Sequence, residues 1–70
     1  MIVHYVVDDG EVFNVFSSDM FDSLGRYYED TSINFKDLDI VARYYDMDEA
    51  FKHAEQLNEI YNGYRDAKKD

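Results

Sequence analysis

The fold of this chain is decided by one amphipathic stretch, residues 46–61, with the sequence DMDEAFKHAEQLNEIY. Its apolar residues recur every three or four positions, which is the period of an α-helix packed on a core. This apolar stripe comprises Met47, Ala50, Phe51, Ala54, Leu57 and Tyr61. Asp46 precedes the stripe as an N-cap, and Glu49 stands three residues later, as in a capping box. Asn62-Gly63 predicts the end of the helix, with Gly63 as a left-handed cap.

The acidic residues of this helix fall on the side opposite the apolar stripe. At 100° per residue, Asp48, Glu55 and Glu59 lie within about 40° of one another. Lys52 is their only basic neighbour. We therefore expect these three acids to mark the solvent side of the helix.

Residues 2–16 predict a β-hairpin, because two runs of β-branched and aromatic residues flank the turn sequence DDG. A two-residue loop would place Asp8 directly opposite Glu11, and like charges in that position are unfavourable. A three-residue loop with Gly10 in the left-handed region pairs Val7 with Glu11 instead, and we favour this register. It places the following residues on one face: Val3, Tyr5, Val7, Phe13 and Val15.

The next segment predicts a first helix over about 19–29, with Ser18 as its cap. Residues at helical spacing form its inner face: Met20, Phe21, Leu24, Tyr27 and Tyr28. Its outer face carries Asp19, Asp22, Arg26, Glu29 and Asp30. Gly25 weakens this helix by roughly 1 kcal/mol relative to alanine.

A connection over 31–37 leads to a third predicted strand, residues 38–45. Alternation places one set of side chains on one face: Leu38, Ile40, Ala42 and Tyr44. The other face takes Asp39, Val41, Arg43 and Tyr45. A helix over 35–45 also fits the spacing, but the Ile-Val and Tyr-Tyr pairs favour a strand.

These elements predict an α+β fold of order ββαβα in one domain, residues 1–66, with a frayed tail over 67–70. A right-handed crossover would place the third strand beside the first. The result is a three-stranded antiparallel sheet of order 2-1-3 with two helices packed on one face. The other face would stay uncovered, and its apolar residues, Val41 and Tyr45 among them, would suit a dimer or partner surface.

The composition predicts a globular, cytoplasmic protein. Of the 70 residues, 46% are hydrophobic and 17% aromatic, which is too apolar for a disordered tail. The chain has no cysteine, so disulfides and zinc–thiolate sites are excluded. No apolar run approaches the roughly 20 residues that span a bilayer, and the opening MIVHYVV lacks the basic flank of a signal peptide.

The sequence carries no Gly-rich phosphate loop, no G-x-S-x-G elbow and no H-E-x-x-H motif. We expect a non-enzymatic protein without cofactor or metal. Glu49 and His53 lie one helical turn apart, but two ligands do not complete a metal site. We expect His53 at the boundary of the core and His4 in a strand.

Charge is the main functional signal. Sixteen Asp and Glu face seven Lys and Arg, which gives a net charge of −9. Nucleic acid and anionic membranes are therefore poor partners, whereas a basic protein surface is a suitable one. The candidate partner-binding acids are Asp8, Asp9 and Glu11 at the hairpin tip, Asp19, Asp22, Glu29 and Asp30 on the first helix, and Asp48, Glu55 and Glu59 on the second.

Two functional hypotheses follow from these patterns. In size and charge the chain resembles small acidic phage-encoded inhibitors of the anti-restriction and anti-CRISPR type. That resemblance implies a nucleic-acid mimic that blocks the basic groove of a DNA- or RNA-binding protein. The alternative is a structural or regulatory module that forms a homodimer or docks through the open sheet face, with the acids serving solubility.

Overall fold

The core of the fold is an antiparallel sheet of three strands: β1 (His4–Asp8), β2 (Phe13–Ser17) and β3 (Asp39–Tyr44). The computed structural model describes residues 1–68, with the side chains of residues 1–61. The strand order is β2-β1-β3, and both pairings are antiparallel. The predicted sheet is thereby confirmed, as is the choice of strand over helix for β3.

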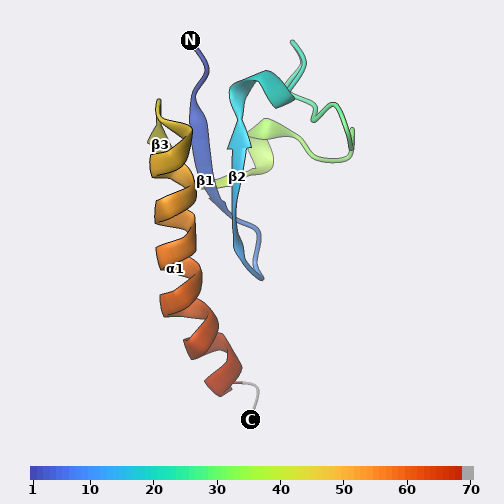
Figure 1. The fold of residues 1–70 in the computed structure, drawn as a ribbon. Coiled ribbons are helices and arrows are strands. Elements are labelled where there is room, and N and C mark those ends of the chain that lie inside the picture. The colour runs from blue at the N-terminus through green and yellow to red at the C-terminus, as the bar shows by residue number, and fades with distance from the viewer. Residues whose placement is uncertain (69–70) are drawn as a thin grey trace.

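One α-helix, α1 (Met47–Lys68), packs on one face of the sheet. Its start is the predicted one. The Asp46 carboxylate accepts a hydrogen bond of 2.9 Å from the backbone N–H of Asp48, which satisfies a donor that the first helical turn leaves free. Figure 1 shows α1 as a long helix that runs past the end of the sheet.

The predicted end of this helix is wrong, because α1 continues through Asn62-Gly63 to Lys68. A glycine inside a helix costs only about 1 kcal/mol relative to alanine, so it permits an end without imposing one. The predicted frayed tail, 67–70, thus begins inside α1, and residues 69–70 lie outside the described part of the chain.

The face of α1 that meets the sheet is narrower than the predicted stripe. Ala50 and Ala54 are buried and form the main core with Val6 and Phe13. Around it pack Val15, Ala42, Tyr44 and Leu57. Two small alanines let the helix approach the sheet closely, and the larger residues beside them then lie at the edges. Phe51 is consequently 54% exposed, so its predicted place in the apolar stripe that packs on the core is wrong.

The hairpin register also differs from the predicted one. Asp8 pairs with Phe13 and Val6 with Val15, which leaves a four-residue loop, 9–12. The Asp9 carboxylate accepts hydrogen bonds from the backbone N–H groups of Glu11 and Val12, so a side chain shapes this loop. The predicted pairing of Val7 with Glu11 is wrong, although Gly10 does adopt a left-handed conformation, with φ of 95°.

This register assigns the side chains of the hairpin to two faces. Residues that pair directly share a face, so Val6 and Val15 point toward α1, while Tyr5 and its partner Phe16 point away. A shift in the β1–β3 pairing skips Val41 and places Ile40 opposite Val7. The prediction that Ile40 shares a face with Ala42 and Tyr44 is therefore wrong. The prediction that Tyr5 and Val7 share a face with Phe13 and Val15 is also wrong.

The first predicted helix, 19–29, does not form. Its place is taken by a 3-10 turn, η1 (Ser18–Met20), and a loop that is closed by a bridge between Phe21 and Tyr27. The Asp22 carboxylate accepts hydrogen bonds from the backbone N–H groups of Leu24 and Arg26, which favours a turn over a helix. Gly25 completes that turn with φ of 79°.

Aromatic rings from this loop cover the face of the sheet opposite α1. Five rings form the cluster, with centroids 5.0 to 5.9 Å apart in successive contacts: Tyr5, Phe16, Phe21, Tyr27 and Phe35. Phe35 begins a second 3-10 turn, η2 (Phe35–Asp37), that leads into β3. The sheet thus lies between α1 and the segment 18–37, on opposite sides in Figure 1. The sheet face that we predicted to be open is therefore covered. Tyr28, which we predicted on the inner face of a helix over 19–29, is instead 67% exposed.

Candidate acidic binding surface

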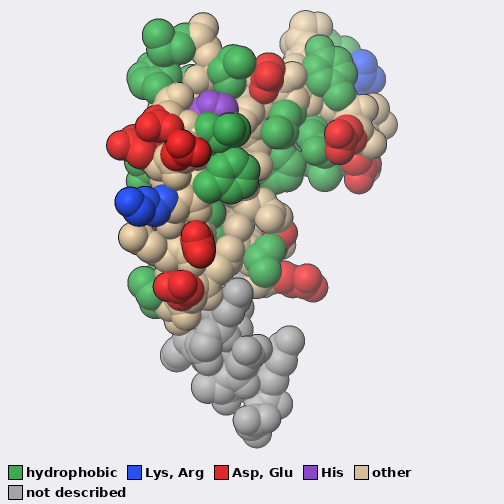
Figure 2. All heavy atoms as spheres, viewed as in Figure 1, with side chains coloured by type: hydrophobic (Ala, Val, Ile, Leu, Met, Phe, Trp, Pro, Cys, Tyr) green, Lys and Arg blue, Asp and Glu red, His purple; other side chains and the backbone are tan. Residues whose placement is uncertain are grey.

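The acids of α1 occupy its exposed side, as predicted. Asp48, Glu55 and Glu59 are all exposed. Helix geometry separates Asp48 from Glu55 by about 10 Å along the axis, and Glu55 from Glu59 by about 6 Å. Among the described residues, none donates a hydrogen bond to these three carboxylates or forms an ion pair with them. Figure 2 shows acidic side chains along α1, with basic side-chain atoms between them.

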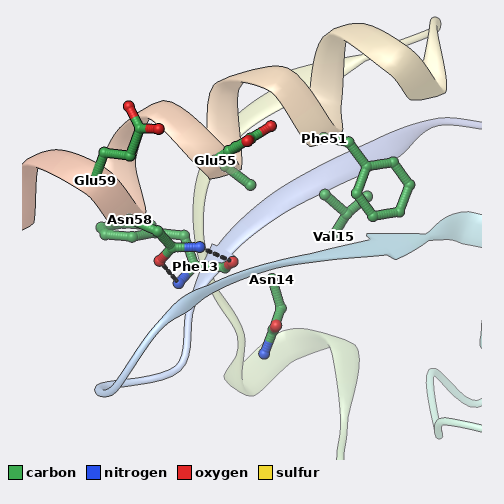
Figure 3. Close-up of a pocket in the computed structure, with 8 residues that line it drawn as sticks. Phe13, Asn14, Val15, Phe51, Glu55, Asn58 and Glu59 are labelled. Atoms are coloured by element: carbon green, nitrogen blue, oxygen red, sulfur yellow. Dashed lines mark hydrogen bonds between the residues drawn. The ribbon is translucent and has the colours of Figure 1, made fainter. Parts of the chain in front are cut away.

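A groove runs between α1 and β2 on the same side of the molecule (Figure 3). Its volume is about 520 Å³. The apolar part of its lining comes from Phe13, Val15, Phe51 and Ala54. Glu55 and Glu59 line it from α1, so two of the three predicted helix acids border a partly apolar groove.

Asn58 closes the groove where α1 crosses the end of β2. Its side-chain oxygen accepts a hydrogen bond of 2.6 Å from the Phe13 N–H, and its amide donates one of 3.0 Å to the Phe13 carbonyl. Figure 3 shows both bonds. The side chain thus ties helix to strand, which explains why a polar residue lies on the inner side of α1. Asn58 was not predicted from the sequence. A polar residue one helical turn after Ala54, on the inner side of the helix, could have indicated a contact with the sheet.

The acids at the hairpin tip take part in local structure. Asp8 accepts a hydrogen bond of 2.9 Å from the Gly10 N–H. Asp9 also accepts one of 2.6 Å from the Asn14 side chain. Glu11 is exposed. Asp8 and Asp9 line a second hollow together with Asp37 and Asp39, two acids that the sequence reasoning did not select.

Most acids of the segment 18–37 are also engaged locally. Asp22 forms an ion pair of 3.1 Å with Arg26, and the pKa of Asp22 is lowered, chiefly because the Arg26 backbone N–H donates to its carboxylate. Hydrogen bonds from the Ser32 hydroxyl and backbone lower the pKa of Asp30. Glu29 accepts a bond of 3.1 Å from the Tyr27 hydroxyl. Desolvation, followed by that bond, raises the pKa of Tyr27.

The structure therefore does not gather all the predicted acids on one surface. Asp19 is exposed on η1, and it belongs with Asp22, Glu29 and Asp30 to the layer opposite α1. Only Asp48, Glu55 and Glu59 share one element and one side. We call these three residues the α1 acidic row.

Both histidines have partners inside the fold. His53 lies at the core boundary, as predicted, with its Nδ1 atom 2.9 Å from the Tyr44 hydroxyl. His4 lies in β1 with its Nδ1 atom 2.6 Å from the Ser17 hydroxyl. Among the described residues, no three or more His, Cys, Asp or Glu side chains are grouped so that they could hold a metal ion.

The described helices include none that combines the length and apolar character needed to cross a membrane.

Comparison with known protein families, curated proteins and solved structures finds no match to this chain.

Proposed function

We propose that this chain is a small, acidic, non-enzymatic binding protein that mimics nucleic acid and blocks the basic groove of a DNA- or RNA-binding protein. The observation that supports this proposal best is the α1 acidic row. Its three carboxylates project from one rigid helix, and none is neutralised by a partner among the described residues. Acids of the turns, such as Asp22 and Asp30, contribute to the overall negative field but are already engaged locally.

The spacing of the row suits such a partner. A strand of B-DNA carries one phosphate per 3.4 Å of helix axis, so the roughly 10 Å between Asp48 and Glu55 spans about three phosphates. A groove that binds several phosphates presents several Lys or Arg side chains at comparable intervals. The net charge of −9 adds long-range attraction, which accelerates encounter with a basic surface.

Each ion pair on this exposed surface contributes little to the binding free energy. An exposed ion pair contributes only about 0.2–1 kcal/mol, so no single acid of the row would determine binding. Three pairs acting together, with the field of the whole chain, would give an affinity that depends strongly on salt. We therefore expect several small contributions to the binding free energy, all of which high salt weakens.

A second candidate surface is the outer edge of β3. Tyr45 is 72% exposed, and Val41 is exposed as well. Exposed apolar side chains beside an edge strand suit a docking or dimer contact. In that function the partner would contact Val41 and Tyr45, and the acids would serve solubility.

The proposal is tested by changing the α1 acidic row to Asp48→Lys, Glu55→Lys and Glu59→Lys in one variant. The matched control carries Asp19→Lys, Glu29→Lys and Asp37→Lys, which alter the net charge equally on other elements. Partners captured from a lysate of the source cells are then measured for affinity at low and high salt and for displacement by duplex DNA. The first variant should bind about 10- to 100-fold more weakly, since three pairs are lost. The control should change the affinity much less.

Capture that high salt leaves unchanged, or that DNA does not displace, would contradict the mimicry. Equal losses in the two triple variants would show that net charge alone matters. If neither triple variant loses affinity while Tyr45→Ala abolishes binding, the β3 edge is the functional surface.

A further inference from the structure

The strand β2 forms one edge of the sheet, and its backbone orientation can be fixed from its contacts. The N–H of Phe13 points away from β1, because Asn58 accepts its hydrogen bond. The N–H of Ser17 also points away, toward the sulfur of Met20 at 3.4 Å. In a strand the backbone groups alternate in direction, so Val15, midway between them, points its N–H and C=O outward too. Within the described residues we find no hydrogen-bond partner on that side for Val15.

Val15 lines the groove between β2 and α1, as does Asn58, which pairs with the outward backbone of Phe13. We therefore infer that the outward backbone of Val15 opens on this groove. A free N–H and C=O pair on an edge strand is the element that strand addition uses. Asn58 shows that a peptide-like group fits beside this edge, because its carboxamide pairs with both the N–H and the C=O of Phe13. A peptide group of another chain could pair with Val15 in the same manner, one step further along the strand.

The side chains around Val15 indicate which kind of segment fits. Phe51 offers a half-exposed ring next to Val15, and Glu55 and Glu59 border the same groove. Lys and Arg have long apolar stems and charged ends, so one such side chain can cover the Phe51 ring and reach a carboxylate. An acidic or purely apolar segment would leave both glutamates unpaired.

We propose that an extended segment of a basic partner, with Lys or Arg at every second position, adds to β2 at Val15 and lies in this groove. This inference rests on the proposed function, and it specifies how the basic partner is held. The alternate residues of the segment face α1 and place their charges at Glu55 and Glu59. Its backbone exchanges two hydrogen bonds with Val15.

The test uses a synthetic probe, the heptapeptide acetyl-TRTRTRT-amide. Its matched control is acetyl-RRRTTTT-amide, which has the same charge without the alternation. The protein is prepared with α-hydroxyvaline at position 15, which replaces the Val15 N–H by an ester oxygen and keeps the side chain. The same replacement at Val41, the exposed valine of the opposite edge strand, serves as the protein control. Affinities are measured by titration calorimetry, and exchange of the Val15 amide hydrogen by NMR.

The alternating peptide should bind more tightly than its control and should slow exchange of the Val15 amide hydrogen at least tenfold. The ester at position 15 should weaken its binding about 3- to 10-fold, as expected for the loss of one hydrogen bond. The ester at position 41 should leave the affinity unchanged. Glu55→Gln with Glu59→Gln should weaken binding of both peptides.

Each other result overturns the inference in a recognisable way. Equal binding of the two peptides without protection of Val15, but with loss in the double Gln variant, refutes strand addition and leaves the acidic surface intact. Loss only with the ester at position 41 places the segment on β3. Protection of Val15 that rises with protein concentration, without peptide, makes a second copy of the chain the occupant. No binding of either peptide at low salt refutes the inference.

Discussion

Replacing Phe13 by alanine should destabilise the fold several times more than replacing Phe51, although the two side chains are identical. Phe13 is 7% exposed and belongs to the core, so Phe13→Ala removes a buried ring and leaves a cavity. Such a change costs about 3–5 kcal/mol. Phe51 is 54% exposed, so a little under half of its burial is at stake. Full burial of a phenylalanine contributes about 1.5–3 kcal/mol, which gives roughly 1 kcal/mol for Phe51→Ala.

The assay is urea denaturation followed by circular dichroism, with equal slopes required before the free energies of unfolding are compared. In a domain of this size, Phe13→Ala could abolish folding, so Phe13→Leu provides a milder second variant. It should still destabilise more than Phe51→Leu does. Equal destabilisation by the two alanine variants would refute the orientation of α1, in which alanines rather than Phe51 face the sheet.

Three further predictions concern the cap, the glycines and one carboxyl group. Asp46→Ala should reduce the free energy of unfolding by about 0.5–2 kcal/mol, because it removes the hydrogen bond to the Asp48 N–H; an unchanged denaturation midpoint would contradict the cap. Gly25→Ala and Gly10→Ala should each destabilise the fold by about 1–2 kcal/mol, since φ is 79° at Gly25 and 95° at Gly10, and a residue with a Cβ is strained there. The pKa of Asp22 is lowered, so its contribution to stability is present above its ordinary value of 3.8 and is lost as the pH falls through the folded-state value. A carboxyl NMR titration of Asp22 with its midpoint at or above 3.8 would contradict this.

The start of α1 and the order of the sheet could be predicted because both depend on strong local patterns. Asp46 and the alanines at helical spacing identify the helix from neighbouring residues alone. The two strands of the hairpin and the single crossover leave few possible topologies. The exposure of the α1 acidic row followed from the same helical period.

The segment 18–37 could not be predicted from spacing. Its aromatic residues fit a helical period, but they also fit a loop whose rings stack on the sheet. The Asp22 side chain decides between the two by bonding to the Arg26 N–H. Gly25 adopts a left-handed conformation, which a helix interior does not allow. The hydrophobic pattern alone does not distinguish the helix from the loop.

The hairpin register and the groove were missed for a related reason. Asp9 fixes the loop through its carboxylate, and a change in the loop reassigns every side chain of one strand to the other face. The groove requires Asn58 to meet Phe13, which lies 45 residues earlier in the chain. Contacts over that distance depend on how α1 is rotated on the sheet, which the helical stripe defined only approximately.

The most direct test of the proposed function is an NMR map of the protein bound to its captured basic partner. We expect the largest chemical-shift changes at Asp48, Glu55 and Glu59 and at Val15 in β2. Changes confined to Val41 and Tyr45, with the signals of the α1 acidic row unmoved, would contradict the account.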